Sequence, residues 1–320
     1  MRILITGGAG YIGATATSML IDRGYEVNVL DDFSTGHLEG VDSRAKLIQG
    51  SLLNIQDIRT ALSECEAVMH FAGKALVGES VEKPKLYEET NVIGSMNLLS
   101  EMKAVNVEKL VFSSTCATYG EPKSSPISED AETLPVNPYG KTKLAVDRMI
   151  TEEARGSLAA ISLRYFNVAG ALKSKNGWLS ERHDPETHLI PNILKATTEN
   201  PMKVFGNDWP THDGTCIRDY IHVIDLIEAH IKALQNLKSG EHQIFNLGSG
   251  AGHSVAEVIS AAATVVGHKI PHTFSPRRSG DPGVLVADIS KAQSQLDWSP
   301  TRSLDEIVRD TWESQKDIVN

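Results

Sequence analysis

Short apolar runs and longer amphipathic stretches alternate along the chain, and they predict alternating strands and helices. Runs typical of buried strands recur at residues 2–6, 27–30, 46–49, 67–72, 109–112 and 159–164. Stretches with helical spacing of apolar residues separate them, most clearly at 85–105 and 139–153. This alternation is typical of a parallel sheet covered by helices, so the predicted fold class is α/β with a doubly wound parallel sheet.

The pattern loosens beyond residue 168. Segments 176–186 and 206–215 are rich in Gly, Asp, Asn and Pro, which predicts loops. Segments 219–237 and 243–247 are more apolar, and we expect them to return to the main sheet. The second half of the chain is therefore predicted to build a smaller region beside that sheet.

The first predicted strand runs directly into a glycine-rich turn. Gly7, Gly10 and Gly13 stand between this strand and an amphipathic stretch. A strand, a glycine turn and a helix form the arrangement in which backbone amides hold a dinucleotide pyrophosphate at the helix N-terminus. The missing side chains let the backbone approach the phosphates and let the helix pack closely on the strand.

An acid at the end of the second predicted strand favours NAD over NADP. Asp31 stands where a carboxylate accepts hydrogen bonds from the adenosine ribose and repels a 2′-phosphate. No Arg or Lys occurs between residues 31 and 40. We therefore predict a Rossmann-type NAD-binding domain over residues 1–167, with returning segments near 219–247, and a smaller α/β substrate-binding domain over 168–320.

A tyrosine and a lysine stand at positions i and i+4 at the start of the helix predicted over 139–153. Such positions share one helix face, so the ammonium of Lys143 is expected beside the phenol of Tyr139. A phenol titrates near ~10, and a neighbouring cation lowers its pKa. Thr115, just past the strand predicted over 109–112, adds a hydroxyl. These three residues are the predicted proton-transfer site.

Composition and charge exclude several classes of partner. Hydrophobic residues make up 41% and charged residues 22%, and the formal net charge of −10 argues against a nucleic-acid partner. No stretch approaches the ~18 apolar residues of a membrane span, so no membrane partner is predicted. The three cysteines, Cys65, Cys116 and Cys216, have no close spacing, which predicts reduced thiols and a cytoplasmic location.

No metal site is predicted. No pair of Cys or His has the spacing of a zinc site. His183 and His188 stand too far apart in the sequence and lack a companion acid pattern. His70 falls inside the run 67–72 and is predicted to be a buried, hydrogen-bonded strand histidine rather than a catalyst.

Taken together, the motifs resemble the extended short-chain dehydrogenase/reductase superfamily over nearly the whole chain. The glycine turn and the Tyr139–Lys143 pair occur throughout that superfamily. Narrower motifs are similar to its nucleotide-sugar 4-epimerase branch, namely Val77-Gly78-Glu79-Ser80, Phe205-Gly206-Asn207-Asp208 and Arg218-Asp219-Tyr220-Ile221-His222-Val223. The resemblance implies NAD-dependent interconversion of UDP-glucose and UDP-galactose, with NAD retained between turnovers.

The resemblance also implies catalytic roles. Tyr139 exchanges the proton of the sugar 4-hydroxyl, and Thr115 hydrogen-bonds the same hydroxyl. Lys143 binds the nicotinamide ribose and holds down the pKa of Tyr139. Carbon 4 is transiently oxidised, the flat 4-keto sugar turns over in the pocket, and hydride returns to its opposite face.

Binding residues carry over by position. The implied cofactor site comprises Gly7, Gly10, Tyr11, Ile12, Gly13, Asp31, Asp32, Ser34, Leu52, Phe71, Ala72, Asn91, Ser113, Tyr139, Lys143 and Phe166. Arginine forks suit a diphosphate, and a phenylalanine is implied beside the uracil. The implied UDP-sugar site comprises Thr115, Tyr139, Asn167, His188, Leu189, Phe205, Arg218, Tyr220, Arg278 and Asp281.

Three positions depart from the pattern of the resembled branch. Ser51 replaces an acid that reaches the adenine, which predicts a weaker grip on NAD. Ala75 stands where some epimerases have a cofactor-contacting lysine. Leu285 occupies the position that sets the width of the pocket above the sugar. Its intermediate size leaves open whether an N-acetylated sugar is accepted.

Other functions remain as alternatives. An epimerase of another UDP-sugar, an N-acetylhexosamine, a pentose or a uronic acid, would share the scaffold. A 4,6-dehydratase is disfavoured because it needs an acid pair after Thr115, where this chain has Cys116 and Ala117. A non-catalytic NAD sensor would have no reason to keep Thr115, Tyr139 and Lys143 together. The resemblance further implies a homodimer built on segments 85–105 and 139–153.

Overall fold

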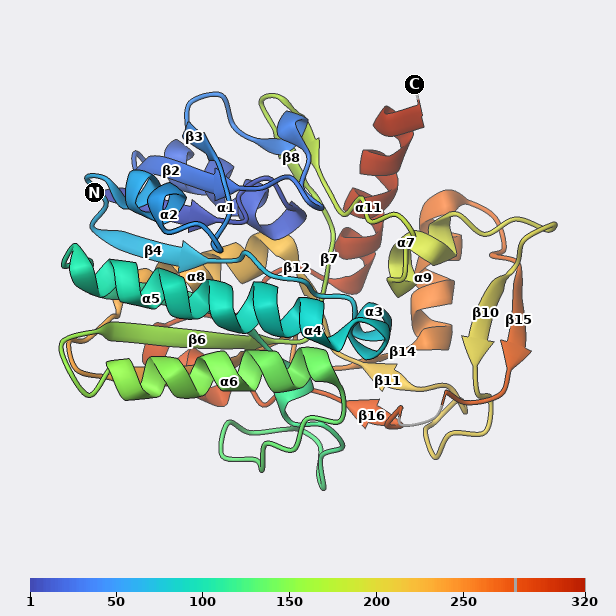
Figure 1. Ribbon diagram of the computed structural model, residues 1–320. Helices are drawn as coiled ribbons and strands as arrows, with labels where there is room; N and C mark the ends of the chain where they lie inside the picture. Colours follow the sequence, from blue (N-terminus) through green and yellow to red (C-terminus); the bar gives the residue numbers. More distant parts are fainter. Residues whose placement is uncertain (279–280, 320) are drawn as a thin grey trace.

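A seven-stranded, all-parallel sheet forms the centre of the protein (Figure 1). The computed structural model describes residues 1–278 and 281–319. The strands follow the order β3 (Lys46–Gln49), β2 (Glu26–Asp31), β1 (Arg2–Thr6), β4 (Ala67–His70), β5 (Lys109–Thr115), β6 (Ala159–Tyr165) and β13 (His242–Leu247). Their apolar runs are nearly continuous because both faces of the sheet are covered.

Helices cover the sheet from both sides. One face packs on α1 (Tyr11–Asp22), α8 (Val223–Gln235) and α10 (Ser290–Leu296). The other packs on α2 (Ile55–Leu62), α5 (Gly94–Ala104) and α6 (Pro138–Glu153), of which α5 and α6 lie in front of the sheet in Figure 1. The predicted doubly wound α/β fold is confirmed.

The long helix predicted over 85–105 is interrupted. It consists of α4 (Pro84–Tyr87), a π-helical turn η2 (Glu88–Ile93) and α5, and it follows the short helix α3 (Val77–Glu82). Asn91 lies on the π-helical turn, where its amide bonds both the N–H and the carbonyl of Lys74 at 2.8 and 3.0 Å. Such turns are common at functional sites.

The smaller region packs on one end of the sheet. It contains the strand pairs β7 (Asn167–Ala169) with β12 (Tyr220–His222) and β10 (Met202–Phe205) with β15 (His272–Ser275). A small sheet joins β14 (His253–Ser254), β11 (Ile217–Arg218) and β16 (Val284–Leu285). A separate apolar core lies among these strands and the helices α7 (Leu189–Leu194), α9 (Val255–Val266) and α11 (Leu304–Val319).

Two expectations for the second half of the chain have different outcomes. The segment 176–186 was expected to be a loop, but it contains β9 (Gly177–Leu179), which pairs with β8 (Leu172–Ser174) as a hairpin. The expectation is wrong there because the strand is defined by its pairing with β8, which the composition of 176–186 does not reveal. The segment 243–247 returns to the main sheet as expected, within β13 beside β6. The segment 219–237 does so only through α8, because its strand β12 pairs with β7 in a separate sheet.

No helix in the described part of the chain is both long enough and apolar enough to cross a membrane.

Candidate active site

The glycine turn between β1 and α1 is shaped by close backbone contacts. Gly7 has a φ of +72°, and a Cβ there would lie 2.7 Å from the backbone nitrogen of Ala72. A Cβ on Gly13 would lie 2.1 Å from the carbonyl oxygen of Gly7. At Gly10 the nearest atom would be 3.5 Å away, so that glycine leaves room for a ligand. The turn therefore fits the dinucleotide cradle predicted from its spacing.

The start of α1 points its free amides at this turn. Among the described residues no side chain caps this end of the helix, and its first turn carries no acid. Uncapped amides at a helix N-terminus favour an anion such as a pyrophosphate. Asp31 lies alongside, accepting hydrogen bonds from the backbone N–H groups of Ala9 at 2.9 Å and Phe33 at 2.8 Å. The pKa of Asp31 is raised, because the effect of burial exceeds the lowering by these two hydrogen bonds.

Three adjoining cavities gather nearly all of the predicted residues. The first, of about 360 Å³, is lined by Gly7, Gly10, Tyr11, Ile12, Gly13, Phe71, Thr115, Tyr139, Lys143, Phe166, Asn167 and His188. The second shares its glycines and adds Asp31, Asp32, Ser34, Leu52 and Ala72. The third shares Asn167 and His188 and adds Leu189, Phe205, Arg218, Tyr220, Arg278 and Asp281.

Two predicted cofactor residues line none of these three cavities within the described chain. The side-chain amide of Asn91 hydrogen-bonds the backbone of Lys74 and the hydroxyl of Thr142. Ser113 accepts a hydrogen bond at its carbonyl from Nζ of Lys143, and its hydroxyl bonds the Tyr165 hydroxyl at 2.9 Å. Both residues therefore support neighbours that line the cavity.

The helix α6 presents Tyr139 and Lys143 at its first two turns. Pro138 begins the helix, and the Asn137 side chain accepts a hydrogen bond from the N–H of Gly140 at 2.8 Å, which caps it. Both functional side chains are buried, with 8% exposure for Tyr139 and 5% for Lys143. Nζ of Lys143 donates to the Ser113 carbonyl at 2.9 Å.

Burial shifts the two pKa values in opposite directions. It raises the pKa of Tyr139 well above its ordinary value, with Tyr165 adding to the rise and a hydrogen bond to Thr115 opposing it. Burial lowers the pKa of Lys143 to about 8, and Asp147 opposes that shift. The expected lowering of the Tyr139 pKa is not what this environment produces, because desolvation of the phenolate outweighs the hydrogen bond with Thr115.

The third cavity holds the two predicted arginines. The guanidinium of Arg278 lies over the Phe205 ring, 3.9 Å from its centroid. Arg218 pairs with Asp281 at 3.4 Å and donates to the carbonyl of Ile217 at 2.9 Å. The cavity thus has an aromatic wall and two cations, which suits a nucleoside diphosphate.

The three departing residues have different positions. Ser51 lines the second cavity and Ala75 the first. Leu285 lines none of the three among the described residues; it packs against a buried cluster that contains Tyr119 and Phe166. Phe166 itself lines the first cavity, so Leu285 packs against a residue of that cavity's wall.

Tyr165 and Asp219 are site residues that sequence reasoning missed. Tyr165 lines the first cavity at the end of β6, and burial raises its pKa to about 12. Asp219 is fully buried and accepts hydrogen bonds from the backbone N–H groups of Ser249, Gly250 and Ala287. It thereby anchors two loops beside Arg218. Asp219 stands inside the motif that begins at Arg218, and Tyr165 precedes the predicted Phe166, which was the available signal.

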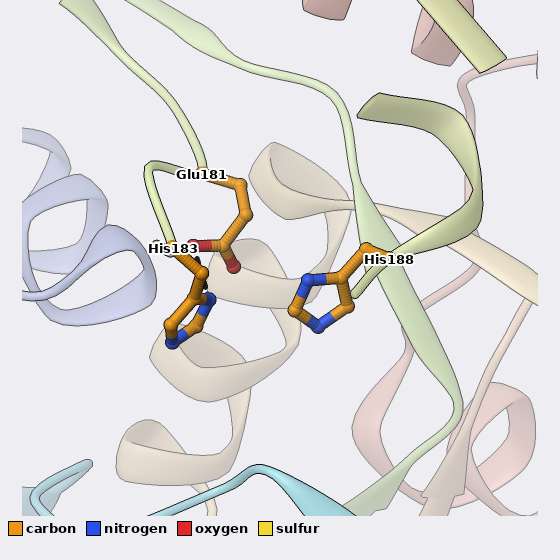
Figure 2. A group of neighbouring side chains, drawn as sticks. All are labelled: Glu181, His183 and His188. Atoms are coloured by element: carbon orange, nitrogen blue, oxygen red, sulfur yellow. Dashed lines mark ion pairs between the residues drawn. The ribbon is translucent and has the colours of Figure 1, made fainter. Parts of the chain in front are cut away.

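His183 and His188 lie close together in the structure, contrary to the expectation from their spacing. Their rings lie 5.4 Å apart, and Glu181 stands with them. Figure 2 shows the Glu181 carboxylate pointing into the space between the two rings. The sequence argument, that the histidines stand too far apart and lack an acid, is wrong, because the loop between β9 and α7 folds back on itself. His70 is buried and bonded to Thr6 and Ser95 as predicted.

A Rossmann-type sheet with this glycine turn and a Tyr–Lys pair defines a class of NAD-linked enzymes. The chain belongs to the NAD dependent epimerase/dehydratase family, whose model matches residues 3–248. The predicted superfamily and its cofactor NAD are confirmed at this level.

Individual relatives are UDP-glucose 4-epimerases. The chain is 49% identical over 318 residues to that of Corynebacterium glutamicum, covering 98% of this chain and 95% of the relative. It is 47% identical to the one from Streptomyces lividans, with the same coverage. A solved Brucella ovis UDP-glucose 4-epimerase in complex with NAD has a TM-score of 0.92 at 39% identity, covering 98% of this chain and 97% of that one.

Proposed function

We propose that this chain is a UDP-glucose 4-epimerase that interconverts UDP-glucose and UDP-galactose using bound NAD. The observation that carries the proposal is the adjacency of the cavities. The glycine turn, Tyr139 and Lys143 line one cavity, and the cavity with Arg218 and Arg278 adjoins it. A nicotinamide, a sugar and a nucleoside diphosphate can therefore lie in sequence. Relatives of this name from Corynebacterium glutamicum and Streptomyces lividans support the same activity.

The cofactor site is proposed along the edge of the sheet. Bound NAD supplies the hydride acceptor for carbon 4 of the sugar. The turn at Gly7, Gly10 and Gly13 receives the pyrophosphate against α1, and Asp31 receives the adenosine ribose. The remaining proposed contacts come from Tyr11, Ile12, Asp32, Ser34, Leu52, Phe71, Ala72 and Phe166, which line the first two cavities.

The proton transfer is proposed for the buried end of the first cavity. Tyr139 exchanges a proton with the sugar 4-hydroxyl, which Thr115 orients through its own hydroxyl. The raised pKa of Tyr139 has to fall for the side chain to be present as the phenolate, the form that accepts that proton, and positive charge nearby has this effect. Lys143 is the cationic side chain on the same helix face, buried in the same cavity.

The UDP group is proposed to bind in the third cavity. Arg218 and Arg278 contact the diphosphate, Phe205 contacts the uracil and Asp281 the distal ribose. Asn167, His188, Leu189 and Tyr220 complete the proposed substrate contacts and line that cavity. A UDP-glucose 4-epimerase from Bifidobacterium longum was solved in complex with NAD+ and UDP, at 34% identity and a TM-score of 0.92 over 100% of this chain and 99% of that one.

A second substrate class follows from a structural relative. The UDP-Glc/GlcNAc 4-epimerase of Campylobacter jejuni is 36% identical, with a TM-score of 0.86 over 99% of both chains. Leu285 packs against the cluster that contains Phe166, a residue of the first cavity, and its side chain is smaller than the tyrosine that some epimerases have at this position. UDP-N-acetylglucosamine is therefore the second candidate. Dehydration is disfavoured because burial raises the pKa of Cys116 to about 12, so its thiol is a poor proton shuttle.

A homodimer is proposed through the helices in front of the sheet. Apolar side chains are exposed on α3, η2 and α5, with exposures of 46% for Val77, 63% for Val81, 40% for Ile93 and 50% for Met96. These elements contact one another directly or through α4, and Val77 also lines the first cavity. Exposed apolar surface of this kind is typical of an interface.

A reducing, cytoplasmic location is proposed from the cysteines. Cys65, Cys116 and Cys216 are all free, and Cys65 is buried. Unpaired thiols are typical of cytosolic proteins. Fractionation of the source cells, with recovery of the protein outside the soluble cytosolic fraction, would contradict this location.

Proton NMR of the purified protein with UDP-galactose and no added cofactor tests the proposed activity. The anomeric signal of UDP-glucose should appear, because the proposed enzyme retains NAD between turnovers. Conversion only after NAD is added would mean a weakly held cofactor, in agreement with Ser51 in the adenine-side cavity. No conversion in either tube contradicts the proposed substrate, and UDP-N-acetylglucosamine is then the next substrate to test.

A further inference from the structure

The loop between β9 and α7 gathers three metal-binding side chains. Glu181, His183 and His188 each offer one ligand atom, and these atoms lie within 4.8 Å of one another. All three residues line the first cavity. Two imidazole nitrogens and one carboxylate oxygen are a known donor set for Zn²⁺ sites that keep an open coordination position.

We propose that Glu181, His183 and His188 bind a divalent transition-metal ion of the Zn²⁺ class, and that the bound ion inhibits the enzyme. Donor atoms around a tetrahedral zinc ion lie roughly 3.4 Å apart, since each is about 2.0–2.2 Å from the metal. The observed spread needs only a modest side-chain rotation to reach that spacing. Figure 2 shows the carboxylate and the two rings already turned toward a common space.

His188 has a carboxylate partner that fixes the tautomer of its ring. Its Nδ1 lies 2.8 Å from Oε1 of Glu186, and the same oxygen accepts the backbone N–H groups of Thr187 and His188. Because that carboxylate can only accept, Nδ1 carries the proton and Nε2 keeps the lone pair. A carboxylate behind a histidine is the usual support of a metal ligand.

His183 lies close to Glu181 but makes no well-aligned hydrogen bond with it. Its Nδ1 lies 2.6 Å from Oε1 of Glu181, close enough for an ion pair. The angle is nevertheless outside hydrogen-bond geometry, and Nδ1 is buried without a hydrogen bond in the described part of the protein. An ion shared with Glu181 would satisfy that nitrogen. Glu181 and Glu186 also offset the charge of an ion.

The location explains why an ion would inhibit. The same cavity contains Tyr139 and Lys143, so the three ligands stand in the space proposed for the sugar. His188 is also a proposed substrate contact. An ion bound there competes with the UDP-sugar for this space, which raises KM and leaves kcat unchanged. This second half of the proposal rests on the proposed epimerase function, whereas metal binding does not.

Titration of the full-length protein with ZnCl₂ in a non-chelating buffer tests the binding step by calorimetry, without substrate. One ion per chain should bind. His183→Gln should weaken binding at least tenfold, and Glu186→Gln should do so by about 10–100-fold if it supports His188. His212→Gln is the matched control, because His212 also lies near two carboxylates, Asp213 and Glu257, but is 57% exposed and outside the cavity.

Co²⁺ provides a second readout, since a tetrahedral cobalt site with nitrogen and oxygen ligands gives visible absorption bands that His183→Gln should abolish. If the wild type does not bind Zn²⁺, or if His183→Gln binds it equally well, the proposed metal site is refuted. Glu181 is then only an ion-pair partner of His183. Binding without a rise in KM for UDP-galactose overturns the inhibition alone. Failure of the wild type to convert UDP-galactose contradicts the proposed function but leaves the zinc titration interpretable.

Discussion

At the residue scale, burial decides the behaviour of the proposed catalytic pair. The same loss of water raises the pKa of a phenol and lowers that of an ammonium, because it penalises whichever form is charged. Tyr139 and Lys143 show both effects four positions apart on one helix. At pH 7 the pair therefore consists of a neutral phenol and a side chain that is still mostly protonated, because a pKa of about 8 lies above that pH.

Tyr139→Phe should abolish most turnover while NAD stays bound. Phenylalanine keeps the ring, which packs edge-on with Tyr87 at a centroid distance of 6.5 Å, and removes only the hydroxyl. General acid–base groups contribute about 10²–10⁴-fold to rate, so a loss of that size is expected. NMR conversion assays give the rate, and the absorbance of NAD released by denaturation gives its content. A variant that keeps most of its activity contradicts the proposed role.

The value of kcat/KM should fall as pH rises through about 8. Burial lowers the pKa of Lys143 to about 8, so the side chain is charged below that pH and neutral above it. Loss of the ammonium removes the cation that favours the phenolate of Tyr139. Lys143→Arg keeps its charge to above pH ~12, so the residual rate of this variant should show no such decline. A flat wild-type profile up to pH 10 would count against a functional charge on Lys143.

At the element scale, α6 is placed by three kinds of contact. Asn137 caps its first turn, and Gly140 lets it approach the short 3₁₀ turn η3 (Cys116–Thr118). Further along, Asp147 accepts hydrogen bonds from Arg164 on β6, and this ion pair is almost fully buried. These contacts hold the helix bearing Tyr139 against the end of β5.

Gly140→Ala should destabilise the fold, although alanine is the better helix former. Its Cβ would lie 2.4 Å from the carbonyl oxygen of Ala117, and backbone cannot move aside cheaply. We expect a loss of about 1–3 kcal/mol in the free energy of unfolding, measured by urea denaturation. Gly78→Ala is the matched control, because Gly78 also lies early in a helix and a Cβ there meets nothing within 4 Å.

The control should gain up to about 1 kcal/mol from helix propensity. Equal effects of the two substitutions would show that close approach of α6 to η3 is not what requires Gly140.

At the scale of the whole molecule, the cavities lie where the sheet meets the smaller region. The carboxyl ends of β1, β2, β4, β5 and β6 supply one wall, as is usual for open parallel sheets. The other wall comes from β11, α7 and the loop before α7. Pairing of β12 with β7 and the hydrogen bonds of Asp219 join the walls.

The proposed homodimer predicts a particle of twice the 34.8 kDa chain mass. Charges buried in an apolar interface are costly, so Val81→Glu combined with Met96→Glu should shift the protein to monomer. Light scattering after size-exclusion chromatography measures the mass. Leu134→Glu is the control, since Leu134 is 58% exposed but lies in the loop between β5 and α6. A monomeric wild type, or a dimeric double variant, contradicts this interface.

The sequence by itself determined the order of strands and helices, the glycine turn and the Tyr139–Lys143 pair. These features depend on local spacing, because a helix repeat or a turn is complete within a few residues. Asp31 and Thr115 were also placed at cavity walls, since the ends of parallel strands meet at one edge. Arg218, on β11 of the small sheet, was placed at a cavity wall only through the family resemblance.

Only the tertiary structure decided what each side chain meets. The direction of the Tyr139 pKa shift depends on burial by segments remote in sequence. The packing of Leu285 depends on the pairing of β16 with β11. The grouping of Glu181, His183 and His188 depends on how one loop folds back over the cavity. The positions that make such contacts do not follow a helix or strand periodicity along the chain. A local sequence pattern therefore does not predict them.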